Sequence, residues 1–185
     1  VSERAVLARF DPKESEWRRA PAQGSVSANK QLLALPTYRP MIALTAAVTL
    51  QMMGGTQIEL LPADDAGVPG LSIVYGQVVM QTVGKAGTQL RIQAGNRAGV
   101  LTFADPESKV AIAVSRTHVP AADPETQPDP VRVELFATSG RIAWSPSGGG
   151  PPVIAESIGL LTLDAQPAKA TALEKLPEWV RSDTT

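Results

Sequence analysis

One pattern occurs twice in this chain, in Leu71-Ser-Ile-Val-Tyr-Gly-Gln-Val-Val-Met80 and in Val133-Glu-Leu-Phe-Ala-Thr-Ser-Gly-Arg-Ile-Ala-Trp144. Each time, an apolar stretch is followed by a lone glycine and then by a second apolar stretch. A tight turn precedes both copies, at Met53-Gly-Gly-Thr56 and at Asp105-Pro-Glu-Ser108. This self-similarity predicts a duplicated all-β module.

Alternation of apolar and polar residues predicts strands through the middle of the chain. Leu90, Ile92 and Ala94 alternate with polar neighbours, which is the period-2 pattern of a strand with one buried face. Further strands are expected at 31–35, 42–51, 57–61, 100–103, 109–114, 131–135, 141–144 and 158–163. Clusters of Gly, Pro, Asn and Asp separate them at short intervals. The predicted fold class is all-β: an antiparallel sandwich, jelly roll or β-roll with internal pseudo-duplication, plus a short C-terminal helix.

Length and composition indicate one folded domain. The chain has 185 residues, 43% of them hydrophobic, which is enough to bury a sizeable core. We expect a single all-β domain over 1–168 and a short helical tail or linker over 169–185. The helix is expected to begin at Thr171 as its cap, to be interrupted by Pro177, and to dock Trp179 and Val180 on the sheet.

Charge and cysteine content exclude several classes of function. Lys+Arg number 17 against 18 for Asp+Glu, so nothing favours a nucleic-acid partner. The absence of cysteine excludes disulfides, thiolate metal sites and cysteine nucleophiles. Two charge-free stretches, 40–58 and 67–84, are broken by Gly, Pro, Gln and Thr, and no membrane insertion is expected within the chain. Because the first residue is Val, we expect a piece of a longer protein.

The residue types that carry chemistry form no catalytic pattern. His118 is the only histidine, and a nucleophilic triad or a cupin-type metal site needs partners that the sequence does not place beside it. Asp64-Asp65 fits a solvated turn. Gly84-Lys-Ala-Gly-Thr88 lacks the spacing of a phosphate loop and is interpreted as a hairpin turn. The sequence therefore predicts no catalytic residue, no cofactor and no metal site.

Candidate contact residues come from exposed aromatic side chains and from one long loop. Trp17 lies beside two arginines, and Tyr38 lies beside Arg39, which makes these residues candidates for partner or ligand contact. The proline-rich insertion at 119–130 adds three acidic candidates, Asp123, Glu125 and Asp129.

Two other aromatic residues are expected in the core. Tyr75 and Trp144 alternate with Ile73 and Ile142, which places them on buried faces. Exposed aromatics are thus few, although a β-sandwich can bind sugars through such side chains.

The order of turn, strand, glycine and strand resembles the FecR family. Val110-Ala-Ile-Ala-Val114 followed by Val133-Glu-Leu-Phe-Ala-Thr-Ser-Gly-Arg-Ile-Ala143 carries this resemblance, which covers 30–165. Two features depart from the family pattern. Asp105-Pro-Glu-Ser108 stands in place of an Asp-Gly-Ser-like turn, and the proline-rich insertion lengthens the second copy.

The resemblance implies a non-enzymatic sensor or protein-interaction domain of a bacterial envelope protein, acting in transmembrane signalling to a sigma factor. It also implies an extracytoplasmic location, in the periplasm or at the cell surface, within a membrane-anchored protein, and a protein partner in the envelope. No catalytic residue is carried over. A carbohydrate-binding β-sandwich with a glycan ligand and a structural spacer domain remain as alternatives.

Overall fold

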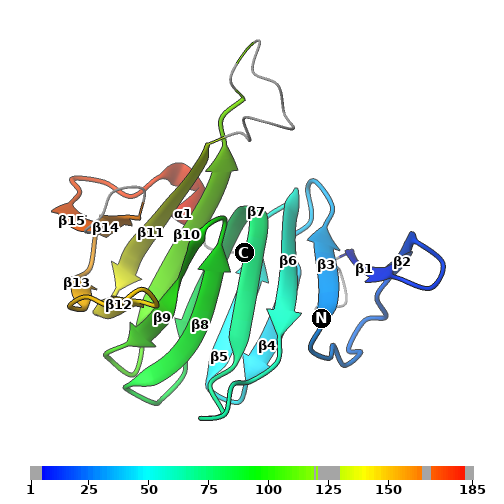
Figure 1. Ribbon diagram of the computed structural model, residues 1–185, viewed down its shortest axis with the longest axis horizontal. Helices are drawn as coiled ribbons and strands as arrows, with labels where there is room; N and C mark the ends of the chain where they lie inside the picture. Colours follow the sequence, from blue (N-terminus) through cyan, green and yellow to red (C-terminus); the bar gives the residue numbers. More distant parts are fainter. Residues whose placement is uncertain (1–5, 119, 121–129, 164–167, 182–185) are drawn as a thin grey trace.

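The computed structural model describes residues 6–118, 120, 130–163 and 168–181. Nearly all of its regular structure is strand, as predicted, with a short helix near the C-terminus (Figure 1). The elements are β1 Leu7–Asp11, β2 Glu16–Arg19, β3 Lys30–Ala34, β4 Met41–Thr45, β5 Val48–Met52, β6 Thr56–Leu61, β7 Gly70–Thr82, β8 Thr88–Ala94, β9 Arg97–Phe103, β10 Lys109–Arg116, β11 Val131–Ser139, β12 Ile142–Pro146, β13 Val153–Ala155, β14 Gly159–Thr162, β15 Lys169–Ala172 and α1 Glu178–Arg181.

The strands form one hydrogen-bonded sheet that is folded into two layers. The first layer has the strand order β2-β1-β3-β6-β7-β8-β9-β12-β13, and the second has β4-β5-β7-β10-β11-β14-β15. Among the described strands, β7 and β8 form a parallel pair, and every other pair is antiparallel. The long strand β7 belongs to both layers and joins them.

Gly76 is the point at which β7 passes from one layer to the other. The residues before it pair with β6 and β8, whereas the residues from Gly76 onward pair with β5 and β10. Its φ of +100° lies in a region that side chains disfavour, and a Cβ there would lie 2.6 Å from the Cα of Thr56. The glycine thus allows both the bend and the close approach of β6.

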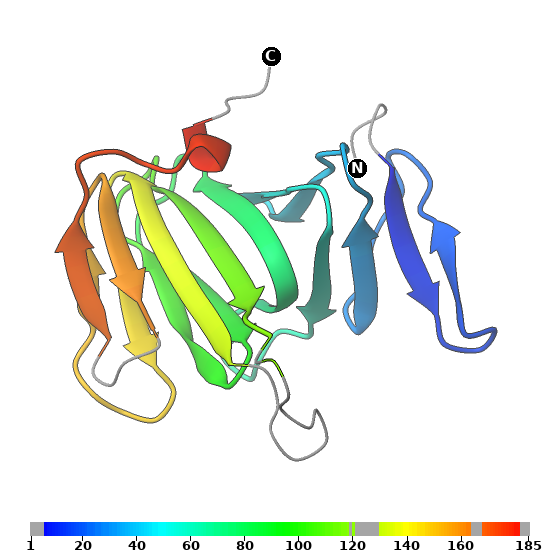
Figure 2. The same ribbon diagram turned by 90° about the horizontal axis from the view of Figure 1, so that it is seen from above.

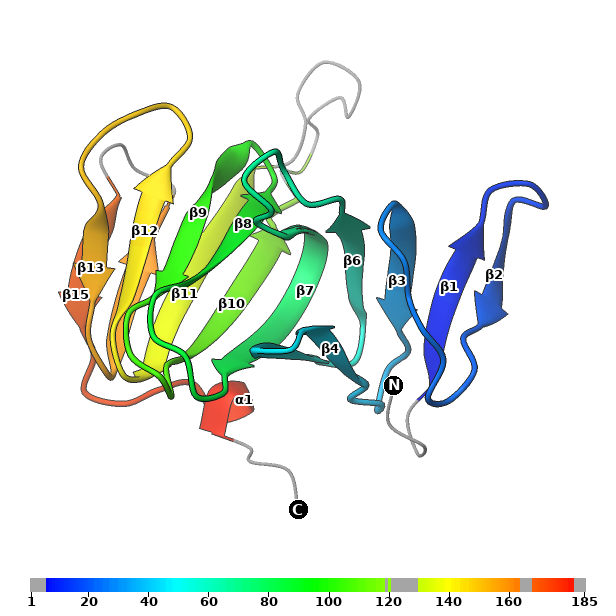
Figure 3. The same cartoon turned by 90° about the horizontal axis from the view of Figure 1, so that it is seen from below.

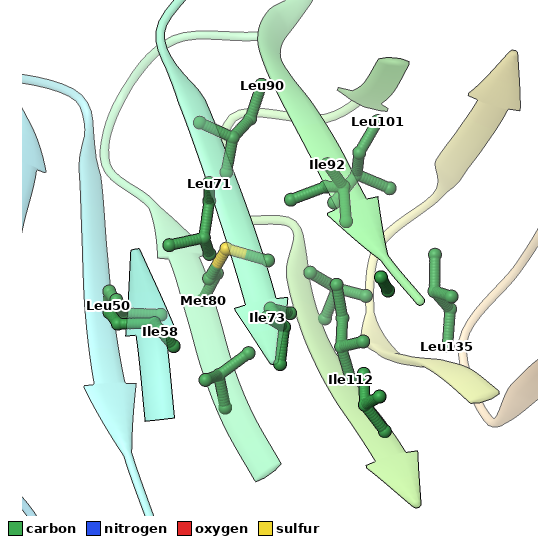
Figure 4. Packing of buried hydrophobic residues seen from close by; sticks show 14 of the residues in the cluster. Leu50, Ile58, Leu71, Ile73, Met80, Leu90, Ile92, Leu101, Ile112 and Leu135 are labelled. Carbon is green, nitrogen blue, oxygen red and sulfur yellow. The ribbon is translucent and has the colours of Figure 1, made fainter. Parts of the chain in front are cut away.

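Apolar side chains from both layers fill the space between them. Figure 4 shows this packing, with side chains from β6, β8 and β9 facing those from β5, β10 and β11. The fully buried members include Leu50, Met80, Ile92, Phe103 and Leu135. The period-2 pattern therefore produced the expected one-sided burial, because alternate side chains of each strand point into the same core.

Both glycine-centred phrases connect the two layers. The first lies within β7 and runs from the first layer to the second. The second spans β11, Gly140 and β12 and runs from the second layer to the first. The two phrases thus cross between the layers in opposite directions, the first within one strand and the second between two strands, and duplication of the module stays a prediction.

The C-terminal segment docks on the outer face of the second layer. Val180 is 5% exposed, and the Trp179 ring meets the Phe136 ring edge-on, with 5.8 Å between the centroids. Docking of Trp179 and Val180 was predicted. The predicted helix start was wrong, because Thr171 lies in β15, where it pairs with Leu160, and α1 begins at Glu178.

Two other expectations need correction, and some short strands were missed. The range 42–51 is not one strand, because Thr45 accepts a hydrogen bond from the Ala47 N–H in a turn that separates β4 from β5. The Gly84–Gly87 turn does not close a hairpin. It connects the second-layer half of β7 to β8 in the first layer, so the two strands run parallel. The short strands β2, β13 and β15 were not predicted, since four residues or fewer carry little periodicity.

The helix α1 has four residues, far fewer than the roughly 20 that a membrane-spanning helix needs. In the ranges that the structure describes, no helix has the length and apolar character to cross a membrane.

A polar cluster ties the β9–β10 turn to the β11–β12 turn. Arg141 donates to the carboxylate of Asp105 from its backbone N–H at 2.8 Å and from Nη2 at 2.9 Å. The buried Ser108 donates from Oγ to the Arg141 carbonyl at 2.9 Å and accepts from the Asp105 N–H at 3.0 Å. These hydrogen bonds from Arg141 hold the pKa of Asp105 below its ordinary value. Those from the side chain contribute most, followed by the one from the backbone N–H.

Because the pKa of Asp105 is lowered, we expect the stability of the fold to depend on pH. The Asp105 carboxylate stabilises the fold at pH values above the ordinary aspartate pKa, and this contribution is lost as the pH falls through the lowered pKa of the folded state. We therefore expect the melting temperature of the wild type to fall more steeply between about pH 6 and about pH 2 than that of Asp105→Asn. Thermal melts followed by circular dichroism measure this difference, with the exposed Asp65→Asn as the control. Parallel profiles for wild type and Asp105→Asn would contradict it.

Candidate interaction surface

The β1–β2 hairpin projects from one end of the molecule. All three views show β2 as the outermost strand at that end, away from α1 (Figures 1, 2 and 3). The base of the hairpin is anchored by Leu7 and Ala20, which belong to the core. Towards the turn at 12–15 the burial decreases, and all four residues of β2 are exposed. The outer part of the hairpin is thus presented to solvent, while its base is anchored in the core.

An aromatic pair lies on the outward face of this hairpin. Phe10 and Trp17 are direct cross-strand partners, and their ring centroids are 5.3 Å apart with a tilt of 58° between the planes. Trp17 is 39% exposed, so part of the indole remains available for contact. Trp17 was predicted as a contact residue from its neighbours alone, and the structure leaves it at the surface.

The opposite face of the hairpin carries a charge cluster around Arg18. Its Nε donates to Glu16 at 2.6 Å, its Nη2 donates to Glu14, and Asp11 lies at 3.9 Å. The hydrogen bond that Arg18 donates to Glu16 is the main cause of the raised pKa of Arg18. Arg9 lies directly opposite Arg18 in β1. The carboxylates therefore offset the repulsion between two neighbouring arginines, and exposed pairs of this kind influence specificity more than stability.

Tyr38 and Arg39 lie in the loop between β3 and β4, on a different part of the molecule. Tyr38 donates its backbone N–H to Leu35 O at 3.2 Å and is 37% exposed. Arg39 borders a hollow of about 280 Å³ beside Trp179 and Met53. The structure thus separates this pair from Trp17. The acidic candidates Asp123, Glu125 and Asp129 lie outside the described residues.

The expectation for Tyr75 was wrong, whereas that for Trp144 was confirmed. Trp144 is buried, but Tyr75 is 37% exposed. A bulge in the β6–β7 pairing sets Tyr75 opposite Gln57 and Ile73 opposite Ile58, so the alternation of β7 shifts just before Gly76. Counting by twos from Ile73 therefore assigned Tyr75 to the wrong face.

Sequence reasoning missed the partners of Trp17. The pairing of Phe10 with Trp17 across the turn at 12–15 was not predicted. A signal existed, because Asp11-Pro12 is a turn-initiating dipeptide between two segments of alternating character.

Among the described residues, no group of three or more His, Asp or Glu side chains is arranged to hold a metal ion. His118 follows the end of β10 and is exposed. Asp64 accepts hydrogen bonds from the N–H groups of Ala66 and Val68, which makes it a turn residue as predicted.

Comparison with known proteins adds no relative to this description. No protein-family model and no curated protein matches the chain.

Proposed function

We propose that this protein is a non-enzymatic protein-interaction or sensor module of a bacterial envelope protein, and that the β1–β2 hairpin is its contact element. The observation that carries the proposal is the hairpin itself, which places the exposed Trp17, packed on the half-buried Phe10, and a charge cluster on a projecting sheet edge. Aromatic and arginine side chains at such positions are the residue types that dominate binding energy in protein interfaces.

The cellular setting rests on the resemblance to the FecR family. It places the module in the periplasm or at the cell surface, anchored to the membrane by another part of a longer protein, with a role in signalling to a sigma factor. The glycines on which the resemblance depends, Gly76 and Gly140, lie where the chain passes between the two layers.

A capture experiment tests the function. The immobilised domain is exposed to envelope extract, retained proteins are identified by mass spectrometry, and the strongest candidate is purified and titrated against the domain. We expect Trp17→Ala to weaken that affinity at least about tenfold, since truncating an interface aromatic commonly costs more than 1 kcal/mol. Tyr75→Ala is the matched control, because Tyr75 has nearly the same exposure but lies outside the hairpin.

Three other outcomes decide against the proposal or refine it. Equal affinity of the Trp17→Ala and wild-type domains would show that the hairpin is not the contact element. Retention of oligosaccharides instead of proteins would favour the glycan-binding alternative. Loss of binding on deletion of 119–130, with Trp17→Ala unaffected, would transfer the contact to the acidic insertion.

A further inference from the structure

We propose that β2 pairs with β2 of a second copy of this chain, antiparallel and about a two-fold axis perpendicular to the sheet, with Trp17 opposite its own counterpart. This inference rests on the proposed function, because it names an occupant for the same hairpin edge. It follows from the hydrogen-bonding pattern of the hairpin, from the order of charges in β2, and from the state of the other sheet edges.

The backbone groups of β2 that face outward can be assigned from the pairing with β1. Ala20 donates its N–H to Leu7 O at 2.7 Å, so these two residues form a hydrogen-bonded pair. Hydrogen-bonded pairs alternate with non-hydrogen-bonded pairs along an antiparallel ladder. Arg18, two residues before Ala20 and opposite Arg9, is therefore the next residue of β2 whose backbone bonds to β1. The N–H and C=O groups of Trp17 and Arg19 therefore point to the outer edge, where none of the described strands pairs with β2.

The sequence Glu16-Trp17-Arg18-Arg19 is complementary to itself in one register. A two-fold axis perpendicular to the sheet keeps outward side chains on the same face in both copies. With Trp17 opposite Trp17, each Glu16 lies opposite an Arg18 of the other copy, so both flanking pairs have opposite charge. In the next possible register, Trp17 of one copy would lie opposite Arg19 of the other. That register would place Arg18 opposite Arg18, which is unfavourable. Charge thus selects the register in which the outward groups of Trp17 bond to each other.

The other three sheet edges are less suited to such pairing. The edge strand β4 follows Pro40 and has an irregular register between Ala43 and Thr45. The edge strands β13 and β15 lie against each other at the opposite end of the molecule, and Pro151 and Pro152 precede β13. These features are known protections against edge pairing. By contrast, the pairing of β2 with β1 has no register shift, and no strand in the described ranges covers the outer edge of β2.

Sedimentation velocity over a series of protein concentrations tests the association. We expect a reversible dimer of the wild-type protein, weak because a four-residue strand buries little area. Trp17→Ala keeps the backbone N–H but removes the contact between the two Trp17 side chains. It should therefore weaken the dimer about tenfold. Trp17→Pro should abolish it, because proline removes the outward N–H but no hydrogen bond to β1. Circular dichroism confirms that each variant is folded.

A cross-linking experiment tests the register independently. The chain has no cysteine, so a single introduced thiol gives an unambiguous product. Opposed residues of a hydrogen-bonded pair lie about 5.5 Å apart at Cα, within disulfide range. Trp17→Cys should therefore form a covalent dimer under mild oxidation, whereas Arg19→Cys, two residues from the axis, should not.

Specific outcomes overturn the inference. A wild-type protein that stays monomeric at every concentration excludes the dimer, and a dimer that survives Trp17→Pro excludes this edge. Equal cross-linking of Trp17→Cys and Arg19→Cys excludes the register. Failure of the dimer is distinguishable from failure of the proposed function, because a monomer that binds an envelope protein in a Trp17-dependent way would refute only the dimer.

Discussion

Gly76→Ala is expected to lower the free energy of unfolding by at least about 3 kcal/mol, or to prevent folding. The new Cβ would lie 2.5 Å from Thr56 Oγ1 and 2.6 Å from Thr56 Cα. Backbone atoms cannot yield as a flexible side chain can. Thr56 is also fully buried and exchanges hydrogen bonds with the Gln77 N–H and C=O at 2.9 and 3.0 Å. Any displacement of β6 would therefore break the bonds that fix the bend of β7.

Chemical denaturation of the two purified proteins measures this loss, and Gly55→Ala provides the matched control. Gly55 has a φ of +77°, but a Cβ there would meet no atom within 4 Å. The control should therefore carry only the backbone strain of a left-handed residue, about 1–2 kcal/mol. If the two variants lose the same stability, the close approach of β6 is not what requires glycine at position 76.

Removal of residues 173–185 is expected to lower the free energy of unfolding by about 3–5 kcal/mol, the range for removing a large aromatic side chain from a core. The segment covers an apolar patch formed by Met53, Val79, Ala111 and Phe136 on the outer face of the second layer. Without it, that patch would be open to water. Binding of a hydrophobic dye should consequently increase in the native state.

Point variants separate the docking contact from the effect of shortening the chain. Trp179→Ala removes the ring that packs edge-on against Phe136 and should reproduce a large part of the loss. Glu178→Ala, at an exposed position of the same helix, should have little effect. Unchanged stability and unchanged dye binding in Trp179→Ala would show that the segment does not seal the patch.

The strands of the core could be predicted because their signal is local. Alternation over five or more residues, as in β8 and the first half of β11, predicts which side chains face the core without knowledge of the partner strand. The same reasoning failed for Tyr75, where a bulge shifts the alternation by one residue. The adjacent Gly76 is a sequence signal for an irregularity in the strand, but the position of the bulge is set by the pairing with β6.

In the candidate site, too, some features follow from local sequence and others only from the pairing of strands. Trp17 could be singled out from the sequence because a tryptophan beside two arginines is an uncommon arrangement for a core residue. Its pairing with Phe10, and its place on an outermost strand, depend on which strands occupy the rest of the layer. A strand edge is open only when no other strand has taken it, which is a property of the whole sheet.

By itself, the sequence determined the all-β class, most strands, the glycine-marked connections and the apolar docking residues of the C-terminal segment. These features depend on periodicity, turn chemistry and side-chain size, which act over a few residues. Only the tertiary structure decided that β7 serves both layers, that Gly84–Gly87 joins parallel strands, and that β2 has an open edge. Those features depend on pairing between distant segments, whose free energy arises only when the layers assemble.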